Sequence, residues 1–351
     1  LGREQEIRSL KGTIGGNAFE LEGKMTQEEG FGLTFQCSSP YLDMEKLFLK
    51  PDSQEAEEVE PATAGSPASM EVGIEGDIYA DRGTFREIEF EPMNAKLLMD
   101  RGVFRTDVTA DFDGGGLTGC AWVNTLHAEG RRFGLCLSAS GMDLGALLRS
   151  LGSEESIIEG RGDVTGTLEG LSVKGEPLAR TLNGRVEIVT GEGVLKRLEV
   201  LSRILTLVDA SKWFTMMPGD LTAEGMPCRR ISGSFEIVDG IASTEDLVLE
   251  ANAMRLSAVG SIDLAKRTMD MTVGFQPLGN FDAVVDQLPI VGHILTGEGH
   301  SLIVFAFRLE GSIEEPRIRP VSLESVGRGM VGILGRLLQL PLDLVDGSFL
   351  P

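Results

Sequence analysis

Short runs of alternating apolar and polar residues, separated by glycine-rich turns, constrain the fold of this chain more than any other feature. In the run from Ser301 to Leu309, the side chains of Ile303, Phe305 and Phe307 would lie on one face. Alternation with period two, carried by β-branched and aromatic residues, is typical of a strand with one apolar face. Similar runs recur along most of the chain. The sequence therefore predicts an all-β protein.

Composition agrees with many tight turns and excludes one class of partner. Glycine accounts for 45 of the 351 residues, which is roughly twice its usual share. These glycines are dispersed and lack a three-residue period, so a collagen-like chain is excluded. The formal net charge is −22, and the sequence contains no basic stripe. Because nucleic-acid binding requires such a stripe, DNA and RNA are not expected as partners.

The patterning also predicts how the chain is divided. The acidic, proline- and alanine-rich stretch near residue 60 has too few large apolar residues to order itself. Leucine and valine recur at three- and four-residue steps after residue 194, which favours an amphipathic helix. We expect residues 1–50 as the end of a preceding β region, 51–70 as an acidic mobile linker, 71–180 as a β meander, 181–322 as a C-terminal β region with a helix over 194–208, and 323–351 as an amphipathic helix and tail.

Five local features follow from turn and helix signals. Asp100–Gly102 and Asp239–Gly240 are expected to form hairpin turns. Asp143 is expected to cap a short helix at its N-terminus. A turn is expected at 191–193, just before the predicted helix. The apolar stretch 281–296 contains a proline and a glycine, so we expect helical or looped packing there and no strand.

The predicted C-terminal helix has an apolar stripe and basic charges in an otherwise acidic chain. Its glycines each weaken an isolated helix by about 1 kcal/mol relative to alanine. It would therefore form best against the end of the sheet, another protein or a membrane surface. The residues expected to dock it are Arg328, Met330, Ile333, Leu334, Arg336 and Leu337. The sequence has no run of about 18 uncharged apolar residues that would predict a transmembrane helix.

The cysteines leave two interpretations open. Their spacing contains no CxxC pair and does not match a zinc site. They can be small buried hydrophobic residues, or Cys120 and Cys136 can face each other on neighbouring strands and form a disulfide in an oxidising compartment. The four residues are Cys37, Cys120, Cys136 and Cys228.

No arrangement of residues with catalytic spacing is found. The GxGxxG match at 114–119 precedes a stretch with strand character, which favours a hairpin turn over a nucleotide site. His293, Glu298 and His300 lie close in sequence, but their spacing fits no standard metal site. The acidic residues are scattered, and no pair stands out as acid and base. We therefore expect a non-enzymatic protein without a metal or a cofactor.

Several motifs, in a fixed order, resemble the C-terminal region of the AsmA-like family of bacterial envelope proteins, relatives of TamB and YhdP. Each motif alone is loose, whereas their order and spacing together are more specific. The segments that carry the resemblance are Ser39–Met44, Leu182–Leu195, Leu288–Gly297, Ile303–Ile313 and Pro316–Ser322.

The resemblance implies a fold, a location and a role. The implied fold is an elongated, curled antiparallel sheet with an apolar groove and a few short amphipathic helices. Alternation by itself cannot distinguish such a groove from a closed sandwich, because both hide one face of each strand. The implied location is the periplasm of a Gram-negative-type cell, with an inner-membrane anchor on an upstream segment. The implied role is phospholipid transport and outer-membrane biogenesis.

Two functional hypotheses result. The first is a lipid-binding or lipid-transfer conduit, in which phospholipid acyl chains lie on the apolar strand faces. The alternative is an envelope scaffold or assembly factor that binds another protein, through a sheet edge or the C-terminal helix. The lipid species and the oligomeric state stay open. The residues expected to contact lipid are Leu256, Ile262, Met271, Val273, Phe275, Ile303, Phe305 and Phe307.

Overall fold

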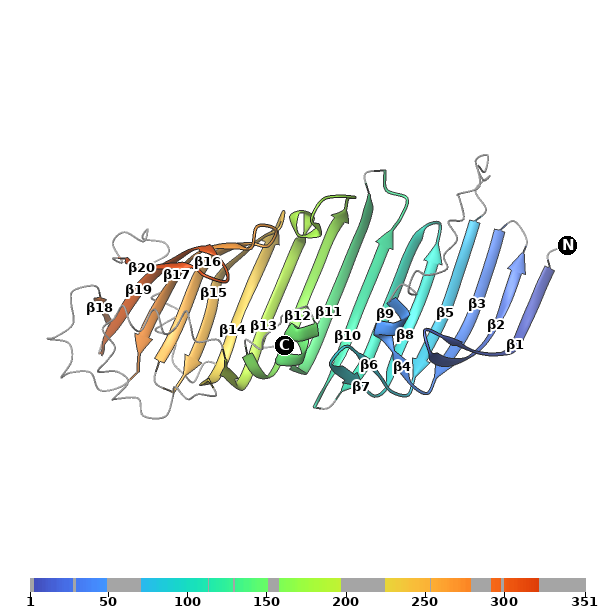
Figure 1. Ribbon diagram of the computed structural model, residues 1–351, viewed down its shortest axis with the longest axis horizontal. Helices are drawn as coiled ribbons and strands as arrows, with labels where there is room; N and C mark the ends of the chain where they lie inside the picture. The colour runs from blue at the N-terminus through green and yellow to red at the C-terminus, as the bar shows by residue number, and fades with distance from the viewer. Residues whose placement is uncertain are drawn as a thin grey trace. The chain divides into compact units, whose positions relative to one another are not determined.

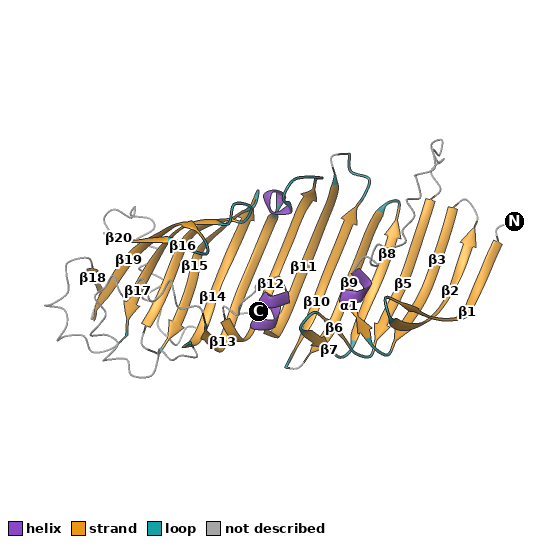
Figure 2. Cartoon of the chain, viewed as in Figure 1, coloured by secondary structure: helices purple, strands orange, loops and turns teal. Residues whose placement is uncertain are grey.

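The computed structural model of the protein is dominated by strands (Figure 2). This confirms the all-β class that the alternation predicts. The chain forms two compact units, each described by itself below. Unit 1 contains Leu1–Met142, Ala146–Ser153 and Thr167–Glu176, and unit 2 contains Asp143–Gly145, Glu154–Gly166 and Pro177–Pro351. The structure describes residues 3–27, 30–48, 71–112, 114–128, 130–150, 158–196, 225–252, 254–278, 292–297 and 300–321.

Unit 1 is built on a layer of strands that pair edge to edge (Figure 1). Neighbours are antiparallel, as expected, except β3 and β5, which pair in parallel. In the order of pairing, the strands are β1 (Arg3–Ile14), β2 (Asn17–Gln27), β3 (Gly30–Ser39), β5 (Glu71–Ala80), β8 (Met93–Asp100), β9 (Val103–Phe112), β10 (Gly115–Asn124) and β11 (Arg131–Asp143).

Small elements accompany this layer. A second, three-stranded sheet consists of β4, β6 and β7. The short helix α2 begins directly after Asp143, as the sequence predicts, and the predicted hairpin at Asp100–Gly102 joins β8 to β9. The bounds are β4 (Leu42–Asp43), α1 (Met44–Phe48), β6 (Gly83–Phe85), β7 (Ile88–Phe90) and α2 (Leu144–Ser150).

Unit 2 contains a second series of strands. Each strand pairs antiparallel with the next in the order β13, β14, β15, β16, β17, β19 and β20. The strand β18 also pairs with β19. The predicted Asp239–Gly240 hairpin joins β14 to β15. The bounds are β12 (Ile158–Ser172, which has residues in both units), η1 (Leu178–Thr181), β13 (Asn183–Leu195), β14 (Met226–Val238), β15 (Ile241–Ala251), β16 (Met254–Asp263), β17 (Thr268–Pro277), β18 (Gly292–Gly297), β19 (His300–Ser312) and β20 (Arg317–Val321).

Three local predictions need correction or fall outside the described residues. The expected turn at 191–193 is wrong, because β13 runs on to Leu195 and pairs there with Met226. The helix predicted over 194–208 therefore does not include Val194 and Leu195, and its residues beyond 196 lie outside the described ranges. The exclusion of a strand from 281–296 is wrong at Gly292, where β18 begins and pairs with β19. A proline and a glycine lower strand propensity, but β19 supplies a pairing edge.

Other predicted segments lie outside the described residues. These are the acidic linker 51–70 and the C-terminal helix 323–351, with its docking residues Arg328, Met330, Ile333, Leu334, Arg336 and Leu337.

Candidate functional site

The strand register of unit 1 brings apolar residues together in rows that cross the sheet. Residues that face each other on paired strands project from the same face, because side chains alternate along each strand. Following the register from β2 to β11 gives rows with one residue on each strand. The outermost of these rows is named row A. It consists of Met25, Leu33, Ile74, Met99, Phe104, Val123 and Phe133.

Three further rows lie on the same face at two-residue steps. Together with row A they form what we call the apolar face of unit 1. Row B is Gly23, Phe35, Gly76, Leu97, Thr106, Ala121 and Leu135; row C is Leu21, Cys37, Ile78, Ala95, Val108, Gly119 and Leu137; row D is Ser39, Ala80, Met93, Ala110, Leu117 and Ala139.

This face is only partly covered. Every side chain of row A is partly exposed, and in row B Leu135 keeps 39% of its surface exposed. Residues on the opposite side of the same strands, such as Thr34, Glu75 and Arg105, are exposed and polar. A fully covered sheet face would hide its apolar side chains almost completely. The apolar face of unit 1 is therefore a surface that can receive an apolar ligand.

Aromatic rings lie against glycines on neighbouring strands of this sheet. A Cβ atom added to Gly76 would lie 2.3 Å from the ring of Phe35 on the neighbouring strand. A Cβ added to Gly12 on β1 would lie 3.0 Å from the ring of Phe19 on β2. The rings thus occupy the space that a side chain on the next strand would take, which is a known way of covering glycines in sheets.

The face ends against a raised border at row D. Leu42 and Phe90, from the small sheet, form a buried cluster with Ala80 and Met93 of row D. Ala80 is fully buried, and Met93 is 4% exposed. We call this border the ledge; it consists of β4, α1, β6, β7 and residues 146–150 of α2.

Specific contacts fix the ledge in place. The side-chain amide of Asn17 donates to the carbonyl oxygen of Asp43 at 3.0 Å, and its oxygen accepts from the amide of Asp43 at 2.7 Å. The Arg149 guanidinium pairs with the Glu87 carboxylate, which joins α2 to the turn between β6 and β7. One strand end of the apolar face is thus closed by a border that is fixed in position.

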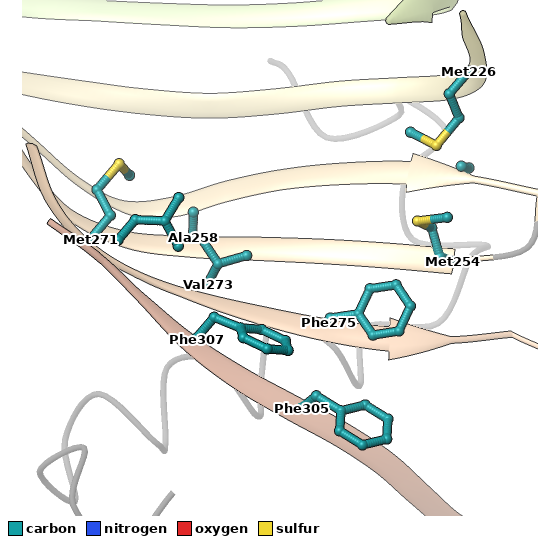
Figure 3. Close-up of a cluster of buried hydrophobic side chains, with 10 residues drawn as sticks. Met226, Met254, Ala258, Met271, Val273, Phe275, Phe305 and Phe307 are labelled. Carbon is teal, nitrogen blue, oxygen red and sulfur yellow. The ribbon is translucent and has the colours of Figure 1, made fainter. Parts of the chain in front are cut away.

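Most residues predicted to contact lipid lie instead in the core of unit 2. Phe275, Phe305 and Phe307 project to one side of adjacent strands (Figure 3). The ring centroids of Phe275 and Phe305 are 6.1 Å apart. Exposure is 7% for Met271 and Val273, 0% for Phe275, 3% for Phe305 and 1% for Phe307, whereas Leu256 and Ile262 are partly buried against the cluster, and the side chain of Ile303 lies outside the described residues.

The described side chains of the predicted set thus share one face, as the alternation indicates, but the structure covers most of them. Lipid contact at these residues stays a prediction. The partly exposed rows of unit 1 are absent from the predicted set, although the signal for them was present. Leu33, Phe35, Ile74 and Ile78 show the same alternation, and only the cross-strand register joins them into rows.

The opposite face of unit 2 is also buried, and it is polar. Glu250 and Arg255 face each other on β15 and β16, and Arg255 faces Gln276 on β17. The Arg255 guanidinium lies 2.8 Å from the Glu250 carboxylate, and the two side chains are 4% and 11% exposed. Ser257, two residues along β16, is 1% exposed. The middle of this sheet therefore has one apolar and one polar buried face.

A depression also lies on the polar side of unit 1. It has a volume of about 760 Å³ and extends over β2, β3, β5, β8 and β9. Its lining includes the carboxylates of Glu20, Glu22, Asp77 and Asp107 together with the ammonium group of Lys96. Such a lining does not suit an acyl chain, because burying unpaired charge against hydrocarbon is costly. We therefore do not place an apolar ligand there.

One of the two cysteine interpretations is realised at Cys120 and Cys136. These residues face each other on β10 and β11 and form a disulfide. Cys37 and Cys228 are free, and burial raises the pKa of both thiols. A raised pKa keeps a thiol protonated and unreactive at neutral pH. The free cysteines therefore act as small buried or half-buried apolar residues.

Replacing both bridged cysteines by serine should lower the free energy of unfolding by about 3 kcal/mol, because a bridge across a sequence separation of 16 restricts the unfolded chain. Urea denaturation of the Cys120→Ser/Cys136→Ser variant and of the oxidised protein measures this difference. Dithiothreitol should destabilise the unmodified protein and leave the variant unchanged. Equal urea midpoints for variant and oxidised protein would contradict the prediction.

Comparison with protein families identifies the chain. The family model described as YhdP protein matches residues 75–318, which is more than half of the sequence. The chain belongs to the YhdP protein family. Membership indicates a bacterial envelope protein connected with lipid transport, and it confirms the resemblance carried by the sequence motifs. Searches of curated proteins and of solved structures returned no match.

No helix in the described ranges is both long and apolar enough to span a bilayer. No group of histidine, cysteine and acidic side chains in them is arranged to hold a metal ion. The side chains of His293 and His300 lie outside the described set.

Proposed function

We propose that unit 1 binds phospholipid, with the acyl chains on its apolar face, and that the protein contributes to phospholipid transport as a lipid-transfer conduit. One observation supports this proposal above all: row A presents a partly exposed apolar side chain on each of seven paired strands. The eight residues predicted from sequence are less suited to a ligand, because most of them have almost no exposed surface.

The dimensions of the face fit acyl chains. At about 4.8 Å between strands, the seven strands of row A span about 29 Å. Rows A to C are two steps of two residues apart, which is about 14 Å along the strands. Half of a bilayer's hydrocarbon core, the depth of one leaflet, is about 15 Å. The face can therefore hold several acyl chains side by side along the strands.

The energetics favour holding a lipid that can still move. Each buried CH₂ group contributes about 0.8 kcal/mol, so a two-chain lipid gains substantial affinity. Apolar contact is non-directional, and the face offers the same kind of surface on successive strands. A bound lipid can therefore shift from strand to strand without breaking hydrogen bonds.

We place this function in the periplasm. Disulfides form and persist in oxidising compartments, and Cys120 is bridged to Cys136. Membership in a family of envelope proteins supports the same location. Attachment to the inner membrane by an upstream segment is part of the proposal.

Leu97 and Leu98 provide a matched test. Leu97 lies in row B of the apolar face, whereas Leu98, the next residue on β8, lies on the opposite face with 40% exposure. Leu97→Asp should reduce the phospholipid that copurifies with the protein several-fold, because a charge would have to be buried under the acyl chains. Leu98→Asp should leave it unchanged. Native mass spectrometry and uptake of a fluorescent phospholipid measure both effects.

The outcomes separate the lipid function from the scaffold alternative. Circular dichroism first verifies that both variants are folded. A wild-type protein that neither carries nor takes up phospholipid would contradict the proposal and favour the scaffold. Equal loss of lipid in Leu97→Asp and Leu98→Asp would show that the apolar face has no special part in binding.

A further inference from the structure

A basic cluster lies on the ledge, at the closed end of the apolar face. Arg86 occupies the two-residue turn between β6 and β7, which pair at Phe85 and Ile88. Its guanidinium donates a hydrogen bond to the carbonyl oxygen of Ser150 in α2. Arg149, the neighbour of Ser150, pairs with Glu87 of the same turn. Two arginines from distant segments are thus brought together.

The Arg86 side chain is held in place by its contacts and keeps further N–H donors for a ligand. Its backbone φ is 54°, in the left-handed region that few non-glycine residues adopt. The guanidinium lies 6.0 Å from the centroid of the Phe85 ring. Arg86 is an exposed residue, and its guanidinium has five N–H donors in a planar fork that suits phosphate oxygens. The described contacts leave most of these donors available to a ligand.

Ser150 supplies the second observation that indicates a ligand. The residue is 3% exposed, and its hydroxyl has no hydrogen-bond partner within the part of the chain that the structure describes. Buried polar groups in folded proteins almost always have a partner, so an orphaned hydroxyl needs an explanation. The side chains of Arg86, Arg149 and Glu87 together carry one net positive charge, in a chain whose formal net charge is −22.

We propose that Arg86, Arg149 and Ser150 bind a phosphate group, and that this phosphate is the headgroup of a phospholipid on the apolar face. This deepens the lipid-binding function proposed above and rests on it. The acyl chains would run along the strands from the ledge over rows C, B and A, a length of about 14 Å that matches one leaflet. The ledge would thereby fix the orientation of the lipid whose phosphate is bound at this cluster.

Binding of phosphatidic acid and of a diacylglycerol with the same acyl chains tests the site on the full chain. The two probes differ only in the phosphate. The wild-type protein should bind phosphatidic acid about tenfold more tightly, as charge-assisted hydrogen bonds to an anion predict. Arg86→Asn should remove this preference and leave diacylglycerol binding unchanged, because asparagine tolerates positive φ but lacks the guanidinium. Ser150→Ala should reduce the preference by a smaller factor.

Arg101 offers a matched control. It also has a positive φ, 42°, but it lies in the β8–β9 hairpin at the other end of the strands. Arg101→Asn should therefore keep the full preference for phosphatidic acid. Loss of the preference in Arg101→Asn as well would show a general effect of charge and would overturn the ledge site.

The remaining outcomes distinguish this inference from the proposed function. Equal binding of both lipids by the wild-type protein would overturn the phosphate site and leave lipid binding intact. Binding of neither lipid would overturn the lipid function, and calorimetric titration with inorganic phosphate would then decide the site. If the wild-type protein shows a heat of phosphate binding that is absent in Arg86→Asn, the cluster is a site for free phosphate. If the wild-type protein shows no heat of binding, the phosphate site is overturned.

Discussion

Replacing Arg255 by methionine should lower the free energy of unfolding by about 3–5 kcal/mol, because it leaves the Glu250 carboxylate buried without its partner. The two side chains are 4% and 11% exposed, and their charged groups lie 2.8 Å apart. Gln276 and Ser257, which surround the pair on the same face, are also almost fully buried. Urea denaturation of the folded variant measures the loss.

A double variant distinguishes the stability that the ion pair contributes from the stability lost when one charge is left buried without a partner. Glu250→Leu/Arg255→Met should recover most of the stability lost by the single variant, because well-packed apolar residues often replace a buried ion pair without loss. A double variant as unstable as Arg255→Met would contradict this account. It would show that the other polar contacts of Arg255 determine the loss.

Phe307→Ala should lower the free energy of unfolding by a similar amount, about 3–5 kcal/mol, through loss of apolar burial and a cavity in the core of unit 2. Phe307 is 1% exposed and faces Val273 on the paired strand. The neighbours of a side chain this deeply buried cannot easily close the space that it leaves. Urea denaturation, with the unfolding of each unit followed by hydrogen exchange, measures the effect.

Phe104→Ala is the matched control in row A of unit 1. The Phe104 side chain is partly exposed, so its truncation removes less buried area and creates no closed cavity. The expected loss is about 1–2 kcal/mol, accompanied by reduced phospholipid binding. Equal losses for Phe104→Ala and Phe307→Ala would contradict the difference in covering between the two apolar faces.

Much of the fold was predictable because strand alternation is a local property. The faces of β19 follow from its sequence, as do the hairpins at Asp100–Gly102 and Asp239–Gly240 and the helix after Asp143. Predictions failed where pairing overrode local preference. Gly191–Gly193 has the composition of a turn, yet the pairing of β13 with β14 extends the strand through it to Leu195.

The sequence predicted the apolar character of the candidate site but not the residues that form it. The sequence indicates apolar strand faces that suit acyl chains, and the strongest alternation led to residues such as Val273, Phe275 and Phe307. These residues are the most strongly apolar, and for that reason they form the core of unit 2. Row B of unit 1 includes small and polar residues, such as Thr106 and Ala121, and therefore gives a weaker alternation. Row A is strongly apolar, but its residues come from seven different strands, and only the register of the sheet places them side by side.

The sequence by itself determined which residues of each strand share a face, and it carried the motifs of the YhdP family. Period-two alternation needs no information beyond the strand itself. Only the tertiary structure decided which strands pair, in what register, and whether an apolar face is covered. Covering depends on contacts between segments far apart in sequence, such as Arg86 with Ser150 at the ledge. The same alternation therefore gives a buried core around Phe307 and a partly exposed surface along row A.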